Sequence, residues 1–78
     1  YVDNSRGIRI AVCESGLNAS AYNPSGASGI FQQLARYWPG RAEMYGVPQG
    51  TSPLDAYWNV RVSTEMFQRG MYSHWVCK

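Results

Sequence analysis

Apolar positions recur at helical spacing near the start of the chain. This spacing predicts a first helix that begins at Asn4 or Ser5, since both residue types are good N-caps. Gly16 is typical of a helix end because glycine adopts the left-handed backbone of a C-cap. The apolar residues fall on two adjacent faces of this helix, with Ile8, Ala11 and Val12 on one, and Ile10, Cys13, Glu14 and Leu17 on the other.

A second periodic segment follows the middle of the chain. Its apolar residues recur every four positions, which predicts a helix that buries one stripe and runs to about residues 69–70. Thr51 or Ser52 would cap this helix, with Pro53 in its first position. The stripe consists of Leu54, Trp58, Val62 and Met66.

The segments between these helices contain the turn residues. Residues 18–28 are rich in Asn, Ser, Pro and Gly and are expected to form a loop. A further helix is expected over residues 29–38, ending before Pro39-Gly40, with a short helical turn at residues 41–45. No segment alternates over the length of a strand, so we predict a mainly α fold in which Trp75 and Cys77 return to the body of the domain.

Composition narrows the function classes. The 78 residues are enough for one domain, and 45% apolar with 15% charged residues is a globular balance. A net charge of +2, with seven scattered Lys and Arg, argues against nucleic acid as a partner. The longest apolar run, residues 10–13, is far shorter than the ~20 residues of a membrane span, and no basic-then-apolar leader occurs.

Two cysteines stand at opposite ends of the chain. A domain this short buries only about 60% of its unfolded surface, so a disulfide between Cys13 and Cys77 is expected to staple it. The alternative is two buried thiols. One histidine and no C-x-x-C pair disfavour zinc, so we predict no metal and no cofactor. A disulfide would imply export, a cell surface or a virion.

Glu14 breaks a local rule. It stands at the end of the first predicted helix, where the dipole disfavours a carboxylate, and on a face expected to be apolar. Both effects favour the neutral acid, which can donate a proton to a leaving oxygen. The alternative is a partly exposed Glu that caps neighbouring amides.

The loop after Glu14 has the features of a ligand ledge. Gly26 and Gly29 leave backbone exposed, and Gln32 offers a donor and an acceptor. Abundant aromatic side chains beside amide groups suit a sugar ring. We expect Trp58 to lie in the core and leave Tyr37 and Tyr57 open between core and site.

Two segments carry a family resemblance. They are Glu14-Ser15-Gly16-Leu17-Asn18 and the run from Asn23 to Gln32, Asn-Pro-Ser-Gly-Ala-Ser-Gly-Ile-Phe-Gln. Together they resemble the soluble lytic transglycosylases, which are lysozyme-like proteins, with Ile30-Phe31 in place of Leu-Met. Ser52-Pro53-Leu54-Asp55 and Asn59-Val60 look like a later segment of that family.

The chain also departs from that family. Asn23 replaces a serine, and the family's A-Y-N motif is absent. Cys13 before Glu14 and the ending Trp75-Val76-Cys77 are instead similar to the resuscitation-promoting factors of actinobacteria, which join such cysteines by a disulfide. The resemblance implies one small lysozyme-like domain over residues 1–78, stapled by a disulfide and monomeric, within a larger protein.

The resemblance implies cleavage of the β-1,4 bond between N-acetylmuramic acid and N-acetylglucosamine in peptidoglycan. Glu14 would be the general acid and then the base. Substrate-binding residues would be Gly29, Gln32, Phe31, Asn23, Tyr22 and Tyr57. The partner would be peptidoglycan glycan strands, with no nucleic acid and no membrane insertion, outside the cell at the wall or on a virion.

The second catalytic group is open. Hydrolysis by two carboxylates needs an acid ~5–9.5 Å from Glu14, and no motif surrounds the available ones, Asp3, Glu43, Asp55 and Glu65. We therefore expect the single-acid route to a 1,6-anhydro product. The alternatives are a hydrolytic muramidase, a catalytically weak peptidoglycan-binding module, and a small helical inhibitor or toxin. His74, with no nucleophile motif, is expected to be packing or surface.

Overall fold

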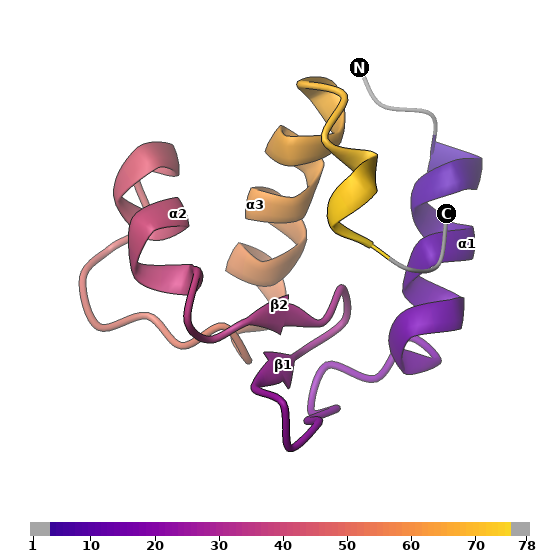
Figure 1. The fold of residues 1–78 in the computed structure, drawn as a ribbon, viewed down its shortest axis with the longest axis horizontal. Helices are drawn as coiled ribbons and strands as arrows, with labels where there is room; N and C mark the ends of the chain where they lie inside the picture. The colour runs from indigo at the N-terminus through magenta and orange to yellow at the C-terminus, as the bar shows by residue number, and fades with distance from the viewer. Residues whose placement is uncertain (1–3, 76–78) are drawn as a thin grey trace.

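The computed structural model describes residues 4–75 of the chain. Three α-helices, a two-stranded antiparallel sheet and a short 3₁₀ helix follow one another along these residues. Helix α3 lies between α1 and α2, and the two-stranded sheet lies near the C-terminal end of α1 (Figure 1). The elements are α1 (Asn4–Ser15), β1 (Ala27–Ser28), β2 (Gln33–Leu34), α2 (Trp38–Tyr45), α3 (Ala56–Gln68) and η1 (Tyr72–His74).

The first helix forms as predicted. It ends at Ser15, and Gly16 follows with a φ of 64°. The N–H of Gly16 donates to the carbonyl of Val12 at 2.9 Å, so the left-handed residue satisfies a carbonyl that the helix end would otherwise leave unpaired. The buried face of α1 is made by Gly7, Ile10 and Ala11, whereas Ile8 and Val12 are exposed.

The third helix begins later than predicted. Asp55 is its N-cap, and its carboxylate accepts a hydrogen bond from the N–H of Trp58 at 3.0 Å. Leu54 therefore lies before the helix and is exposed, while Val62 and Met66 are buried as expected. Ser52 caps only a local turn, because its hydroxyl accepts from the N–H of Leu54.

The helix predicted over residues 29–38 is wrong. Gly29 and Gln32 have φ values of 79° and 50°, which no right-handed helix accommodates. The segment is instead a turn that joins β1 to β2, with Ala27 opposite Leu34 and Ser28 opposite Gln33. A helix, α2, starts at Trp38 and runs through Pro39 and Gly40, since proline is tolerated in the first turn.

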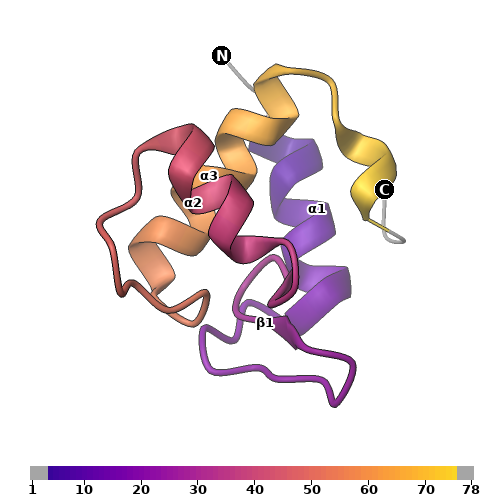
Figure 2. The same cartoon turned by 60° about the vertical axis from the view of Figure 1, so that its left-hand side comes forward.

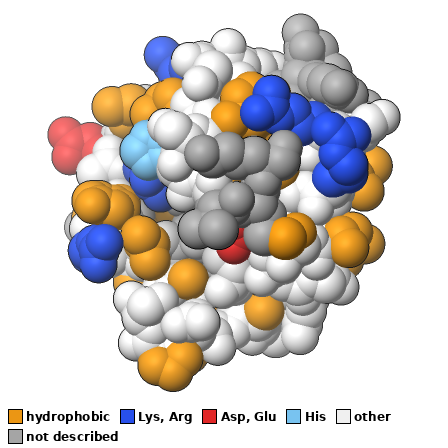
Figure 3. Space-filling model, turned by 45° about the vertical axis from the view of Figure 1, so that its right-hand side comes forward, with side chains coloured by type: hydrophobic (Ala, Val, Ile, Leu, Met, Phe, Trp, Pro, Cys, Tyr) orange, Lys and Arg blue, Asp and Glu red, His pale blue; other side chains and the backbone are white. Residues whose placement is uncertain are grey.

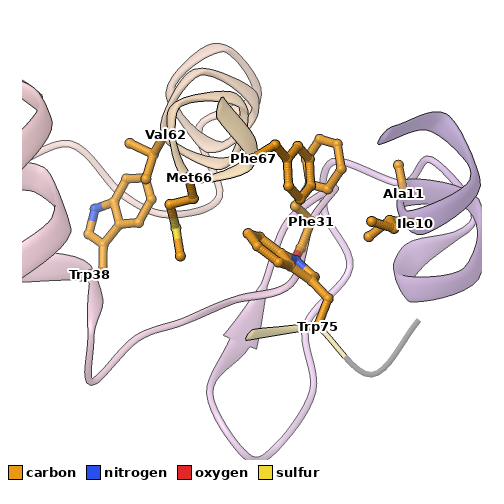
Figure 4. Packing of buried hydrophobic residues seen from close by; sticks show 8 residues of the cluster. All are labelled: Ile10, Ala11, Phe31, Trp38, Val62, Met66, Phe67 and Trp75. Atoms are coloured by element: carbon orange, nitrogen blue, oxygen red, sulfur yellow. The ribbon is translucent and has the colours of Figure 1, made fainter. Parts of the chain in front are cut away.

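An aromatic cluster in the centre of the molecule holds the elements together. Phe31 meets Phe67 and Trp75 edge-on, with ring centroids 5.3 and 6.4 Å away. Figure 4 shows these rings between the side chains of α1 on one side and Trp38 on the other. The predicted return of Trp75 to the body is confirmed, because only 4% of its surface is exposed.

The fold class needs correction in two respects. The predicted mainly α fold also contains a two-stranded sheet, β1 and β2, in the segment where a helix was expected over residues 29–38. The second correction concerns the expected staple: Cys13 is the single cysteine among residues 4–75, so no disulfide pair lies within them, and Cys77 lies outside them. Cys13 does not carry a free thiol, so no reactive-thiol chemistry is assigned to it.

The described part of the chain offers neither a membrane span nor a metal site. None of its helices combines the length and apolar character that a membrane span requires. Residues 4–75 also contain no cluster of three or more His, Cys, Asp or Glu side chains placed to hold a metal ion.

Candidate functional site

The turn of residues 29–32 is the point where the helices meet. The hydroxyl of Ser15, the last residue of α1, donates to the carbonyl of Ile30 at 2.6 Å. The indole N–H of Trp75 donates to the carbonyl of Phe31 at 2.7 Å. Figure 2 shows α1 ending beside this hairpin and the loop that leads to it. The turn is therefore held in one position by segments far apart in the sequence.

The side chain of Asn59 on α3 fixes the same turn by hydrogen bonds. Its Oδ1 accepts from the N–H of Phe31 at 2.9 Å, and its Nδ2 donates to the carbonyls of Ser28 at 2.9 Å and Pro53 at 2.8 Å. The side chain is fully buried, so each of these bonds is shielded from water. Asn59 is a structural residue, although the sequence connects it with a family segment.

Gly29 is required by this contact rather than by a ligand. A Cβ at this position would lie 2.5 Å from Nδ2 of Asn59 and 2.8 Å from the carbonyl of Pro53. Its N–H already donates to the carbonyl of Ala21, and its own carbonyl accepts from the backbone and side-chain N–H groups of Gln32. The Gly29 backbone donor is thus used by the fold, contrary to the prediction that it contacts sugar.

Glu14 lies in the last turn of α1, on the helix face that enters the core. It follows Ile10 by four residues and Ala11 by three, and both are buried. Its own side chain is half-buried. The next residue, Ser15, bonds to Ile30, so the backbone of Glu14 is fixed close to the turn of residues 29–32. This is the placement that the sequence predicted for a candidate acid.

Gln32 is the last residue of this turn, and its side-chain N–H groups already donate within the fold. The Nε2 group donates to the carbonyl of Gly29 at 2.9 Å and to that of Ala21 at 3.2 Å. These bonds stabilise the left-handed backbone of Gln32 and leave Oε1 as the atom that addresses a ligand. The sequence suggested that Gln32 offers a donor and an acceptor, and the structure uses the donor within the fold.

A small polar hollow opens beside Gln32. We call it the basic hollow; its volume is about 180 Å³. Arg41 reaches across it, donating from Nη1 to Oε1 of Gln33 at 2.6 Å and contacting Nδ1 of His74 at 3.2 Å. The face in Figure 3 shows a histidine lying against a basic side chain. The lining residues are Gln32, Gln33, Leu34, Arg36, Tyr37, Arg41, His74 and Trp75.

A second, shallower hollow lies between the turn and α3. It has a volume of about 400 Å³ and is mostly apolar in its lining. Tyr57 contributes to it and is 60% exposed, with its hydroxyl accepting a bond from Arg61 at 2.8 Å. We call it the apolar hollow; its lining residues are Ile30, Ala56, Tyr57, Val60, Arg61 and Thr64.

The remaining predicted binding residues fall in different environments. The ring of Phe31 belongs to the core, with 6% of the residue exposed, so it does not line a cleft as the resemblance implied. Tyr22 is 64% exposed on the loop before β1. Asn23 is exposed too, and its Oδ1 accepts from the N–H of Ser25. Of the predicted set, only Gln32 and Tyr57 line a hollow.

The other carboxylates stand apart from both hollows. Asp55 caps α3, Glu43 is on α2 and exposed, and Glu65 is on α3. Asp3 lies outside the described residues. Within residues 4–75 neither the basic nor the apolar hollow has an acidic lining residue, and Glu14 itself is not among the lining residues.

Sequence reasoning missed the basic hollow altogether. Arg36, Arg41 and His74 are separated by up to 38 positions, and no motif connects them. The one weak signal was that Arg36 and Arg41 flank Tyr37-Trp38. Two arginines at this spacing look no different from arginines on a solvated surface. Comparisons with family models, curated proteins and solved structures found no match to this chain.

Proposed function

We propose that this domain cleaves the glycan strands of peptidoglycan as a muramidase of the lytic transglycosylase type, with Glu14 as the general acid and base. One observation carries the proposal. A half-buried glutamate is the last residue but one of α1, and its neighbour Ser15 bonds to Ile30 in a turn that is flanked by two hollows. Enzyme sites need an acid held against a preorganised binding surface, and this arrangement supplies one.

The chemistry requires only one carboxyl group. The neutral acid of Glu14 gives its proton to the glycosidic oxygen as the bond to C1 of the muramic residue breaks. The resulting carboxylate then takes the proton of the C6 hydroxyl, whose oxygen attacks C1 and closes a 1,6-anhydro ring. Neither the basic nor the apolar hollow beside the turn has an acidic lining residue, and this supports the single-acid route over one with two carboxylates.

The sugar would lie across the turn, between the two hollows. Oε1 of Gln32 can accept from a hydroxyl or an N-acetyl N–H, and the exposed face of Tyr57 can stack on the C–H face of a sugar ring. The substrate places the domain outside the cell, at the wall or on a virion, as part of a larger wall-acting protein.

The test is lysis of purified peptidoglycan by Glu14→Gln. This change keeps the shape of the side chain and removes the proton donor, so lysis is expected to fall by at least ~10²-fold with the thermal unfolding midpoint retained. Glu43→Gln, an exposed position on α2, is the matched control and is expected to keep full activity. Normal lysis by Glu14→Gln would overturn the assignment.

The products decide the route. Mass spectrometry of the released muropeptides is expected to show 1,6-anhydro ends, lighter by one water than hydrolysis products. Hydrated ends would replace the single-acid route with hydrolysis while leaving Glu14 as the acid.

A second candidate is a peptidoglycan-binding module without turnover. The position of Glu14 outside the lining of both hollows favours it. Saturable binding of glycan strands, with no soluble product from wild-type protein, would select this function over catalysis.

A further inference from the structure

Two guanidinium groups contact the same aromatic ring in the lining of the basic hollow. Cζ of Arg36 lies 5.0 Å and Cζ of Arg41 lies 5.1 Å from the centroid of the Tyr37 ring. Cation–π contacts with Tyr37 stabilise each of them, and both residues line the hollow, so two positive charges share its wall. No acidic residue lines the hollow, so among residues 4–75 nothing of opposite charge balances them there.

Arg41 is held in this place at an electrostatic cost. Its guanidinium is half-buried, and burial lowers the pKa of Arg41 from its usual value because the charged form loses hydration. Its partner Gln33 is neutral and buried, and Gln33 in turn donates to the hydroxyl of Ser63 at 2.7 Å. The network therefore orients the cation without neutralising it, which is the arrangement expected of a group that awaits an anion.

His74 belongs to the same wall and contacts Arg41. Arginine only donates, so the 3.2 Å contact with Nη2 of Arg41 makes Nδ1 of His74 the acceptor. In that tautomer the ring proton is on Nε2, and the His74 side chain is part of the lining of the hollow. Its second ring contact is with Trp75, 6.4 Å away between centroids.

We propose that the basic hollow binds a carboxylate carried on a short acyl chain, through Arg36 and Arg41. The planar guanidinium matches the two oxygens of a carboxylate, and bonds of this kind are among the strongest in proteins. At about 180 Å³ the hollow holds one small group rather than a whole nucleotide or sugar. Leu34 and Trp75 in its lining give the acyl carbons an apolar contact, which inorganic phosphate would not use.

The identity of the carboxylate rests on the proposed function. Gln32 lines the same hollow and adjoins the turn near Glu14, so a glycan strand on the turn would direct substituents of its muramic residues here. Those substituents are a lactyl ether and the peptide attached to it, and both carry carboxylates when free. A glycan without such groups, such as a chitooligosaccharide, would leave the hollow unused.

The test uses calorimetric titration of the full chain in the Glu14→Gln background, so that no ligand is cleaved. The probes are a chitotetraose and a muramyl tetrasaccharide of equal length whose lactyl groups are free. We expect the carboxylated ligand to bind roughly tenfold more tightly, and this advantage to be lost on Arg36→Gln or Arg41→Gln. Arg9→Gln, which removes an equal charge from the exposed face of α1, is expected to retain it.

Further measurements identify which carboxylate binds and separate binding from damage to the fold. A muramyl ligand with its peptide attached, compared with the free lactyl form, shows which carboxylate is used, and a preference for either supports the hollow. Arg41→Gln also breaks the bond to Gln33, so the more exposed Arg36 provides a variant that leaves the core untouched. Free lactate, followed by NMR shifts of the His74 and Trp75 side chains, tests the hollow without any glycan.

The outcomes separate this inference from the proposed function. Equal affinity for charged and uncharged tetrasaccharides, or equal losses in Arg9→Gln and Arg36→Gln, would overturn the carboxylate site and leave the role of Glu14 standing. Lactate shifts that vanish in Arg36→Gln would support the site even if wild-type protein fails to cleave peptidoglycan.

Discussion

The hydroxyl of Ser15 donates to the carbonyl of Ile30 across 2.6 Å, joining the end of α1 to the turn between the strands. The same hydroxyl also contacts the carbonyl of Ala11 at 3.2 Å, within its own helix. A single side chain thereby sets where α1 stops relative to the hairpin. Because Glu14 is the preceding residue, its position depends on this bond as well.

The Ser15→Ala variant tests this dependence. Removal of the hydroxyl leaves the Ile30 carbonyl without that donor, and we expect the free energy of unfolding to fall by about 1 kcal/mol. If Glu14 is the acid, lysis should also fall more than the stability change explains, since the helix end is no longer held against the turn. Urea unfolding and lysis rates at a temperature where the protein stays folded measure the two effects.

Ser20→Ala is the control for that change. Ser20 is exposed, and the hydrogen bond recorded for it uses its backbone N–H, which donates to Oδ1 of Asn18. An equal loss of activity in both variants would contradict a positioning role for Ser15.

Gly29→Ala is expected to destabilise the fold strongly. The new methyl group would stand 2.5 Å from Nδ2 of Asn59, at a backbone φ of 79° that alanine adopts with strain. Backbone strain of ~1–3 kcal/mol and the displaced Asn59 act together, so we expect a loss of about 3 kcal/mol or more. Thermal or urea unfolding measures it.

The same change at Gly40, Gly40→Ala, is expected to raise the free energy of unfolding instead of lowering it. Gly40 lies inside α2, where nothing stands within 4 Å of an added Cβ and φ is not positive. Alanine favours the helix, so this variant should gain roughly 0.5–1 kcal/mol. Stabilisation by both substitutions would show that the Asn59 contact is not as close as described.

Asn59→Asp separates the acceptor from the donor role of this buried side chain. The carboxylate can still accept from the N–H of Phe31, but it cannot donate to the carbonyls of Ser28 and Pro53. Facing two carbonyls, the buried acid is expected to destabilise the fold by about 2–4 kcal/mol at neutral pH and by less in acid, where protonation restores one donor. A loss that does not change with pH would contradict this account.

Local rules explain the parts of the fold that the sequence predicted well. Gly16 ends α1 because a residue with positive φ closes the last carbonyls, which depends on nothing beyond the helix itself. Val62 and Met66 are buried because four-residue spacing puts them on one face of the helix, and this apolar face packs against the core. The start of α3 was misplaced since Ser52 and Asp55 are both good caps, and only one of them begins a continuing helix.

The hairpin could not be found in the same way. Residues 29–34 contain good helix formers, and strands of two residues carry no alternating pattern. The left-handed backbone of Gln32 is stable because its amide bonds to carbonyls of Gly29 and Ala21, the second of which is eleven residues away. Tertiary contacts outweighed propensity here.

By itself, the sequence determined the two periodic helices, the glycine that ends the first of them, and the place of Glu14 at that end, because each depends on residues within a few positions of one another. Only the tertiary structure decided that Phe31 is a core ring, that Gly29 makes room for Asn59, and that Arg36, Arg41 and His74 share a hollow. Those relationships join residues tens of positions apart, and chain proximity carries no information about them.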